Sequence, residues 1–197
     1  MKPSRAELSR RASAIRLVVT DVDGVLTDTG VYYTAEGEVA KRFSIRDGMG
    51  VELLRAAGIE TAIMTGETSG SVVKRAEKLR IERTWLGVKN KGDALRAALL
   101  VAQLSPGEVA YIGDDVNDLG AIELVSSEGL TGAPRDAMPA VASVVHHRAR
   151  ADGGYGAFRD FAEWILHLRS GRPVVPRRKR DVPVPRAATV ARQRNKH

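Results

Sequence analysis

The 197-residue sequence predicts an α/β fold in which helices cover both faces of a doubly wound parallel sheet. Two observations lead to this prediction. Short apolar runs rich in β-branched residues alternate with longer segments that look helical, as in strand–helix–strand units. Several of these runs end in loops that carry aspartate, threonine and glycine, which is typical of the carboxyl ends of parallel strands.

The predicted strands are short and mostly apolar. The first is at residues 16–20, and the later ones lie at 61–64, 84–86 and 109–112, with weaker patterns at 129–131 and 143–145. The predicted helices lie between them, at 47–57, 69–79, 91–102, 117–125 and about 155–169. Gly58 ends the first of these helices. Residues 31–34 and 39–43 flank a glycine-containing turn at 35–38 and predict a β-hairpin.

A single Rossmann-like domain is expected at residues 15–170, with the hairpin at about 30–44 as a small insertion. Two basic ends flank this domain: an N-terminal extension at 1–14 and a tail at 171–197, which its composition predicts to be disordered. The net charge of +7 therefore belongs to the two ends. The tail has no aromatic residue for base stacking, so nucleic acid is not expected as a partner.

The sequence also bears on the membrane and on redox chemistry. No apolar run approaches the roughly 18 residues that a membrane-spanning helix needs, and no signal-peptide core follows the basic N-terminus. There is no cysteine, so disulfides and thiolate-bound metals are excluded. These features predict a soluble cytoplasmic protein with no membrane partner.

Polar residues gather where the predicted strands end. They are Asp21 and Asp23, Thr65 and Gly66, and Asp114, Asp115 and Asp118. Lys91 begins a predicted helix and could face the same edge of the sheet. Because ligands of a doubly wound sheet bind outside the carboxyl ends of its strands, we expect these groups to share one crevice.

Such a set of side chains suits phosphoryl transfer. Converging carboxylates repel one another unless a cation neutralises them, and all-oxygen ligation favours Mg²⁺ over Zn²⁺. Lys91, Thr65 and loop amides could hold phosphate oxygens. One carboxylate can attack phosphorus, and a second can protonate the leaving oxygen and then activate water. Each element alone has a structural interpretation as a turn, a loop or a helix cap, but their joint occurrence after successive strands favours a site.

At these residues the sequence resembles the haloacid dehalogenase superfamily. The four motifs that carry the resemblance are Asp21-Val22-Asp23-Gly24-Val25-Leu26-Thr27-Asp28, Thr65-Gly66, Lys91 and Gly113-Asp114-Asp115-Val116-Asn117-Asp118. The resemblance implies that Asp21 is the nucleophile and Asp23 the general acid/base. It also implies that Mg²⁺ is bound by the Asp21 carboxylate, the Asp23 backbone carbonyl and the Asp114 carboxylate, with Asp115 and Asp118 as supporting acids.

Members of this superfamily usually carry a cap domain after the first or second motif, and this chain has no room for one. It is similar to the capless phosphatases of 3-deoxy-D-manno-octulosonate 8-phosphate and of nonulosonate 9-phosphates, with further similarity at 43–50 and 153–159. In that group hairpins associate into a tetramer and a neighbouring subunit covers each site. The resemblance therefore implies a homotetramer, which would also shield an otherwise open cleft from water.

The resemblance also suggests residues that contact the substrate. The octulosonate phosphatases usually have Arg after the Thr-Gly pair, whereas this chain has Glu67. Glu67 together with Arg75 and Lys78 is more similar to the 2-keto-3-deoxy-nonulosonate 9-phosphate phosphatase, in which the basic residues come from a neighbouring subunit. The alternative is that all three lie on an exposed helix surface. Arg46 and Arg159 are further candidates for binding the sugar-acid carboxylate.

Three functions remain open on the sequence alone. The first is a phosphatase of an eight- or nine-carbon sugar-acid phosphate. The second is a capless phosphatase of another small phosphoester, and the third is a non-catalytic oligomerisation module related to domains of acylneuraminate cytidylyltransferases. The presence of Asp21, Asp23, Lys91 and Asp114 argues against the third.

Overall fold

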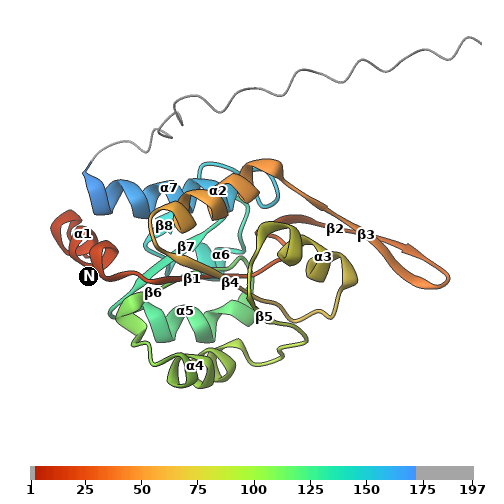
Figure 1. Cartoon of the computed structure of the whole chain (residues 1–197), viewed down its shortest axis with the longest axis horizontal. Coiled ribbons are helices and arrows are strands. Elements are labelled where there is room, and N and C mark those ends of the chain that lie inside the picture. The colour runs from red at the N-terminus through yellow and green to blue at the C-terminus, as the bar shows by residue number, and fades with distance from the viewer. Residues whose placement is uncertain (1–2, 172–197) are drawn as a thin grey trace, which may run out of the picture.

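A computed structural model describes residues 3–171 of the chain (Figure 1). Within this part six strands form one parallel sheet in the order β5-β4-β1-β6-β7-β8. The strands are β1 (Leu17–Thr20), β4 (Glu60–Met64), β5 (Arg83–Trp85), β6 (Val109–Ile112), β7 (Leu130–Ala133) and β8 (His147–Arg148). The chain runs outward from β1 in both directions, so the prediction of a doubly wound sheet is confirmed.

Alternate residues of the strands face opposite sides of the sheet. In β1, Val18 belongs to one apolar cluster, whereas Leu17 and Val19 belong to the other. The first cluster packs against α1 (Arg5–Ala14), α2 (Ile45–Ala56), α3 (Gly70–Leu79) and α7 (Ala157–Ser170). The second packs against α4 (Lys91–Ala102), α5 (Leu119–Ser126) and α6 (Pro139–Ala142). Figure 1 shows α2 and α7 on one side of the sheet, and α4 and α5 on the other.

The middle strand, β1, determines where the polar loops meet. It pairs with β4 and with β6 in parallel register, so that Thr20 lies opposite Ile63 on one side and Ile112 on the other. Asp21, the next residue, donates its backbone N–H to the Ile112 carbonyl at 3.0 Å. The loops that follow β1, β4 and β6 therefore leave the sheet at the same edge, as predicted.

The hairpin is a separate two-stranded ribbon formed by β2 (Thr27–Thr34) and β3 (Gly37–Phe43). It begins closer to β1 than the sequence suggested, and it extends away from the body of the domain (Figure 1). Gly37 follows the two-residue turn with φ of 119°, a conformation that side chains with a Cβ rarely adopt. Two shifts of register interrupt the ribbon.

The N-terminal segment, expected to be an extension, forms helix α1. Ser4 caps it by accepting the Glu7 N–H, and Ala12 is fully buried. The Arg11 guanidinium donates to the carbonyls of Ser126 and Gly129, which ties the helix to the end of α5 and to the loop before β7. The packed part of the chain therefore begins earlier than residue 15.

The predicted strand at 143–145 is wrong. Pro139 starts the short helix α6, and the chain turns before β8, which pairs with Gly132 and Ala133 of β7. The β-branched residues Val144 and Val145 suggested a strand, but pairing with β7 begins two residues later. Two short 3₁₀ helices, Pro106–Glu108 and Val116–Asp118, precede β6 and α5. The tail predicted at 171–197 lies outside the described residues except for Gly171. No helix in the described part is long and apolar enough to cross a membrane.

Candidate active site

Asp21 lies at the centre of the edge where the loops meet. Its residue surface is only 3% exposed, and its two carboxylate oxygens have different partners. Oδ1 accepts the Val22 N–H at 2.7 Å, and Oδ2 lies 2.8 Å from the Lys91 ammonium. The side chain is thus fixed beside a positive charge at the end of the central strand.

Lys91 reaches this point because α4 begins there. Asn90 caps the helix by accepting the Asp93 N–H, so Lys91 is its first residue. Its Nζ also lies 2.7 Å from Asp118 Oδ1. Burial disfavours the charge of this ammonium, but the two carboxylates outweigh that effect and raise the pKa of Lys91.

Asp118 is completely buried and fully used as a hydrogen-bond acceptor. Its Oδ1 accepts the Tyr111 hydroxyl at 2.6 Å, and its Oδ2 accepts the backbone N–H groups of Asp114 at 3.0 Å and Asp115 at 3.3 Å. A Cβ at Gly113 would lie 2.3 Å from the Asp118 carboxyl carbon, so only glycine fits there. These bonds fold the loop after β6 so that Asp114 faces Asp21.

Asp114 has a different environment. Its Oδ1 is buried without a hydrogen-bond partner in the described part of the chain. Burial, with the Asp21 carboxylate beside it, raises the pKa of Asp114 to about 8. Burial likewise raises the pKa of Asp21 to about 7, with Asp118 adding to the rise and Lys91 opposing it. The two carboxylates therefore resist carrying charge together.

The donor set fits a hard divalent cation. Oxygens of Asp21, Asp114 and Asp118 lie within 4.8 Å of one another, and no Cys or His belongs to this group. Asp118 is already satisfied by other donors, which leaves Asp21 and the unpartnered Asp114 Oδ1 to face an ion. Carboxylate oxygens without imidazole or thiolate suit Mg²⁺ and match the predicted cofactor.

The loop after β4 forms another wall of the site. Thr65 is 1% exposed, and its hydroxyl accepts the Glu67 N–H at 3.2 Å. A cavity of about 230 Å³ opens here, and its lining includes most of the predicted residues. The lining residues are Asp21, Asp23, Thr29, Thr65, Gly66, Glu67, Asp114, Asp115 and Asn117.

Known proteins resemble this chain over most of its length. A protein of Yersinia pestis described as 3-deoxy-D-manno-octulosonate 8-phosphate phosphatase is 37% identical over 164 residues, which cover 83% of this chain and 86% of the relative. Residues 38–125 match the model of the haloacid dehalogenase-like hydrolases. The chain belongs to this hydrolase family. The family predicted from the four motifs is therefore confirmed.

Solved structures of the haloacid dehalogenase-like hydrolases agree with the fold. The Moraxella catarrhalis 3-deoxy-D-manno-octulosonate 8-phosphate phosphatase, described in complex with magnesium ion, phosphate ion and a KDO molecule, has a TM-score of 0.77 at 33% identity. That match covers 83% of this chain and 92% of the other. The cobalt-bound enzyme of Haemophilus influenzae has a TM-score of 0.76 at 37% identity and covers 81% and 91%.

The structure separates the predicted substrate residues. Glu67 lines the cavity, whereas Lys78 is exposed on α3 and Arg46 is exposed at the start of α2. The Arg75 guanidinium donates to the Ser44 carbonyl at 2.7 Å. Arg159 forms an ion pair with Glu163 at 2.5 Å. A single chain of this hydrolase therefore brings only Glu67 of the five into the cavity.

Four residues of the site were not among the sequence-based candidates. Thr29 and Asn117 line the cavity, Tyr111 bonds Asp118, and Lys41 lies 2.6 Å from Asp23. Asn117 stands inside the fourth motif and could have been chosen there. The other three could be recognised only from the structure, because Thr29 and Lys41 belong to the hairpin and Tyr111 is a buried residue of β6.

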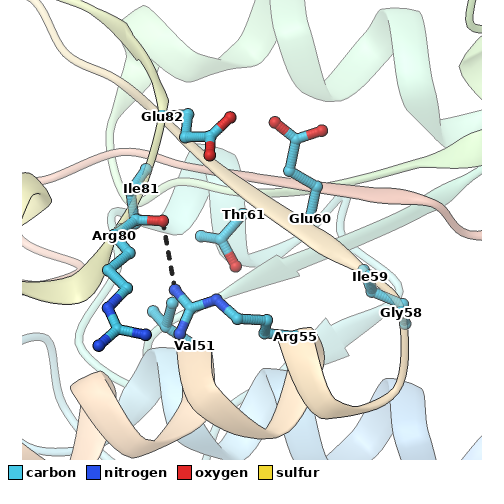
Figure 2. Close-up of a pocket in the computed structure, with 9 residues that line it drawn as sticks. All are labelled: Val51, Arg55, Gly58, Ile59, Glu60, Thr61, Arg80, Ile81 and Glu82. Carbon is cyan, nitrogen blue, oxygen red and sulfur yellow. Dashed lines mark hydrogen bonds between the residues drawn. The ribbon is translucent and has the colours of Figure 1, made fainter.

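A second cavity, of about 320 Å³, lies at the opposite edge of the sheet around the first residues of β4 (Figure 2). Two of the charged side chains that line it, Arg55 and Glu60, are engaged with neighbours. Arg55 donates to the carbonyls of Leu79 and Arg80, and Glu60 pairs with Arg83 at 2.6 Å. No cluster of carboxylates converges on it within residues 3–171. The chemistry of this hydrolase therefore belongs to the smaller cavity beside Asp21.

Proposed function

We propose that this phosphatase hydrolyses the phosphate ester of 3-deoxy-D-manno-octulosonate 8-phosphate. The observation that carries the proposal is the arrangement of the buried Asp21 and Lys91 beside Asp114 at one end of the sheet. The relatives described as phosphatases of this compound support the substrate, because they match more than four-fifths of the chain at 37% identity.

In this proposal the reaction has two steps. An Asp21 carboxylate oxygen attacks phosphorus, and the bond from phosphorus to the sugar oxygen breaks while Asp23 gives that oxygen a proton. The product of this step is an aspartyl-phosphate on Asp21 and a free sugar acid. Asp23 then takes a proton from water, which attacks phosphorus and releases inorganic phosphate, so that both carboxyl groups return to their initial state.

The Asp21 and Asp114 carboxylates and the Asp23 backbone carbonyl would hold Mg²⁺. When bound, the ion neutralises charge on the phosphoryl oxygens and on the carboxylates around it. Lys91 contributes a fixed positive charge, since its buried ammonium contacts Asp21. Thr65 and the backbone of Gly66 bind the remaining phosphate oxygens, and Asp115 and Asp118 support the loop that carries Asp114.

A nine-carbon substrate is the second candidate, and Glu67 favours it. This carboxylate lines the cavity and could accept hydrogen bonds from sugar hydroxyls. Arg75, Lys78, Arg46 and Arg159 would then contact substrate only across a subunit boundary or after moving. The measurement that separates the candidates is kcat/KM for the octulosonate 8-phosphate, nonulosonate 9-phosphates and simple sugar phosphates. A flat profile across this panel would refute both sugar-acid candidates.

Self-association forms part of the proposal. The hairpin exposes Tyr32 to 64%, Tyr33 to 68% and Val39 to 58%, an apolar surface that a second subunit could cover. We expect a homotetramer, which native mass measurements test directly. A dilution-stable monomer with full activity would contradict it.

The test of the mechanism is the Asp21→Asn variant. We expect it to lose Mg²⁺-dependent phosphate release while keeping the thermal unfolding curve of a folded protein. Turnover that survives this substitution would contradict Asp21 as the nucleophile.

A further inference from the structure

We propose that Lys41 of the hairpin is a positioning residue that holds the Asp23 carboxyl in place for proton transfer. This inference rests on the proposed phosphatase function and adds to it a role for the hairpin within the same chain. Its starting point is an ion pair between Lys41 Nζ and Asp23 Oδ1 at 2.6 Å.

Lys41 is unusual for its position in the fold. The hairpin is largely exposed, yet Lys41 is the buried residue of β3, and its side chain is only 1% exposed. A lysine ammonium is strongly hydrated, so burying one is unfavourable unless carboxylates compensate it. Here the compensation comes from Asp23 and, at 3.8 Å, from Glu38. The hairpin thus places a buried charge directly on a residue of the cavity wall.

The partners of Lys41 connect it to a rigid part of the domain. Glu38 accepts a hydrogen bond from the Ser69 hydroxyl, and Ser69 is the N-cap of α3, where it accepts the Val72 N–H. Asp23, Lys41, Glu38 and Ser69 form a continuous chain of polar contacts from the cavity to this helix. The orientation of the Lys41 side chain is therefore fixed by two contacts, one with Asp23 and one with Glu38, which is bonded to the start of α3.

The two oxygens of the Asp23 carboxyl group are used differently. Oδ1 contacts Lys41 and lies 3.5 Å from the Thr27 hydroxyl, whereas Oδ2 is buried and has no hydrogen-bond partner in the described residues. Within residues 3–171, Lys41 is the only basic side chain paired with Asp23. A group that must give a proton to one atom and take it from another works best when its orientation is fixed. Lys41 supplies that constraint and leaves one oxygen unbonded.

The decisive experiment measures how the rate depends on the leaving group. Lys41→Met keeps the length of the side chain and removes its charge. A sugar alkoxide or phenolate needs a proton to leave, whereas 2,4-dinitrophenolate does not. Because general acid catalysis contributes roughly 10²- to 10⁴-fold, we expect kcat/KM, which reports formation of the aspartyl-phosphate, to fall at least about 30-fold on the sugar phosphate and phenyl phosphate. On 2,4-dinitrophenyl phosphate we expect a change within about threefold.

Two further variants separate positioning from folding. Lys41→Arg keeps the charge and should restore most of the rate on phenyl phosphate, and Lys41→Gln is the second neutral variant if the methionine disturbs folding. Arg42→Met is the matched control, since Arg42 lies next to Lys41 but pairs with Asp28 at 2.6 Å. We expect this control to change the rates on all aryl phosphates by the same factor. An equal loss on every leaving group in Lys41→Met would overturn the proposal.

A double variant provides an independent measurement on any phosphomonoester that the wild type hydrolyses. If Lys41 acts through Asp23, Asp23→Asn combined with Lys41→Met is no slower than Asp23→Asn alone. Additive losses would overturn the proposal. The proposed function fails in a different way, through activity that persists in Asp21→Asn, so the two outcomes are distinguishable.

Discussion

The Lys91 ammonium and the Asp118 carboxylate lie 2.7 Å apart, and both side chains are completely shielded from solvent. Breaking such a buried pair usually costs about 3–5 kcal/mol, and without Asp118 the Lys91 ammonium keeps only Asp21 as a carboxylate partner. Asp118 also accepts the Tyr111 hydroxyl and two backbone N–H groups. We therefore expect Asp118→Ala to lower the free energy of unfolding by about 3–5 kcal/mol in urea denaturation without Mg²⁺.

The control for this variant is an exposed ion pair. Lys74 and Glu77 pair at 2.9 Å on α3, with side chains 78% and 58% exposed. Glu77→Ala should change the free energy of unfolding by no more than about 0.5 kcal/mol. Similar losses in Asp118→Ala and Glu77→Ala would show that the buried pair is not a stabilising element.

A substitution at Gly24, compared with one at Gly58, should distinguish loss of activity through displacement of Asp114 from loss of stability through backbone strain. A Cβ at Gly24 would lie 2.0 Å from Asp114 Oδ2, so Gly24→Ala must displace the carboxylate proposed to bind Mg²⁺. A displacement of about 1 Å at a catalytic group can cost about 100-fold in rate, and we expect a loss of that size in kcat/KM.

Gly58 provides the matched control for Gly24. The two glycines have similar positive φ values, 88° and 76°, but nothing lies within 4 Å of a Cβ at Gly58. Gly58→Ala should cost about 1–2 kcal/mol of stability and leave activity unchanged. Equal activity in the two variants would argue against a role for the Asp114 position.

Mg²⁺ should stabilise the folded protein through Asp114. At a free concentration of about 100 times Kd, binding contributes about 2.7 kcal/mol, which corresponds to a rise in Tm of roughly 5–10 °C. Asp114→Asn should abolish this rise in differential scanning fluorimetry. In Asp115→Asn it should persist, because the Asp115 side chain caps the 3₁₀ helix by accepting the Val116 N–H and an asparagine oxygen can do the same. A full Mg²⁺-induced shift in Asp114→Asn would exclude this carboxylate as a ligand.

His147 lies far from the active site, and its titration should make the free energy of unfolding depend on pH. It stacks on Trp164 with ring centroids 4.7 Å apart, and its Nε2 lies 2.8 Å from Asp160. Burial lowers the pKa of His147, with Arg150 acting in the same direction and Asp160 opposing it. The unfolded chain therefore binds a proton more readily, so stability is present above about pH 6.5 and is lost as the pH falls.

The measurement for His147 is urea unfolding between neutral and mildly acidic pH. His147→Phe keeps a ring over Trp164 and removes the titrating group. We expect its free energy of unfolding to decrease less than that of the wild type as the pH falls. Parallel curves for the two proteins would contradict the assignment.

Much of the fold was predictable because local signals agreed with packing. The helix predicted at 91–102 has those bounds, with Asn90 as its cap and apolar residues facing the sheet. Helix α1 was missed because its basic composition suggested a tail, although Ser4 followed by Glu7 is a readable start signal. Its stability comes from tertiary contacts of Leu8, Ala12 and Arg11, which a local pattern does not reveal.

In the candidate site, too, some features could be predicted from the sequence and others depend on tertiary contacts. The residues after β1, β4 and β6 could be expected to meet, because parallel strands end at one edge of a sheet. The pairing of Lys41 with Asp23 could not, because it depends on the angle at which the hairpin leaves the domain. The resemblance suggested a substrate role for Arg75 across a subunit boundary. Within one chain its guanidinium donates to the Ser44 carbonyl, and the role stays a prediction.

The central position of β1 has a consequence for the order of folding. The groups around Asp21 come from three segments that are far apart in the chain, and they meet only when β4 and β6 have both paired with β1. Such long-range parallel pairing is slow compared with helix formation. Recovery of Mg²⁺-dependent turnover after dilution from denaturant should therefore lag behind the return of the helical circular dichroism signal. The rate at which activity returns then measures the last stage of folding.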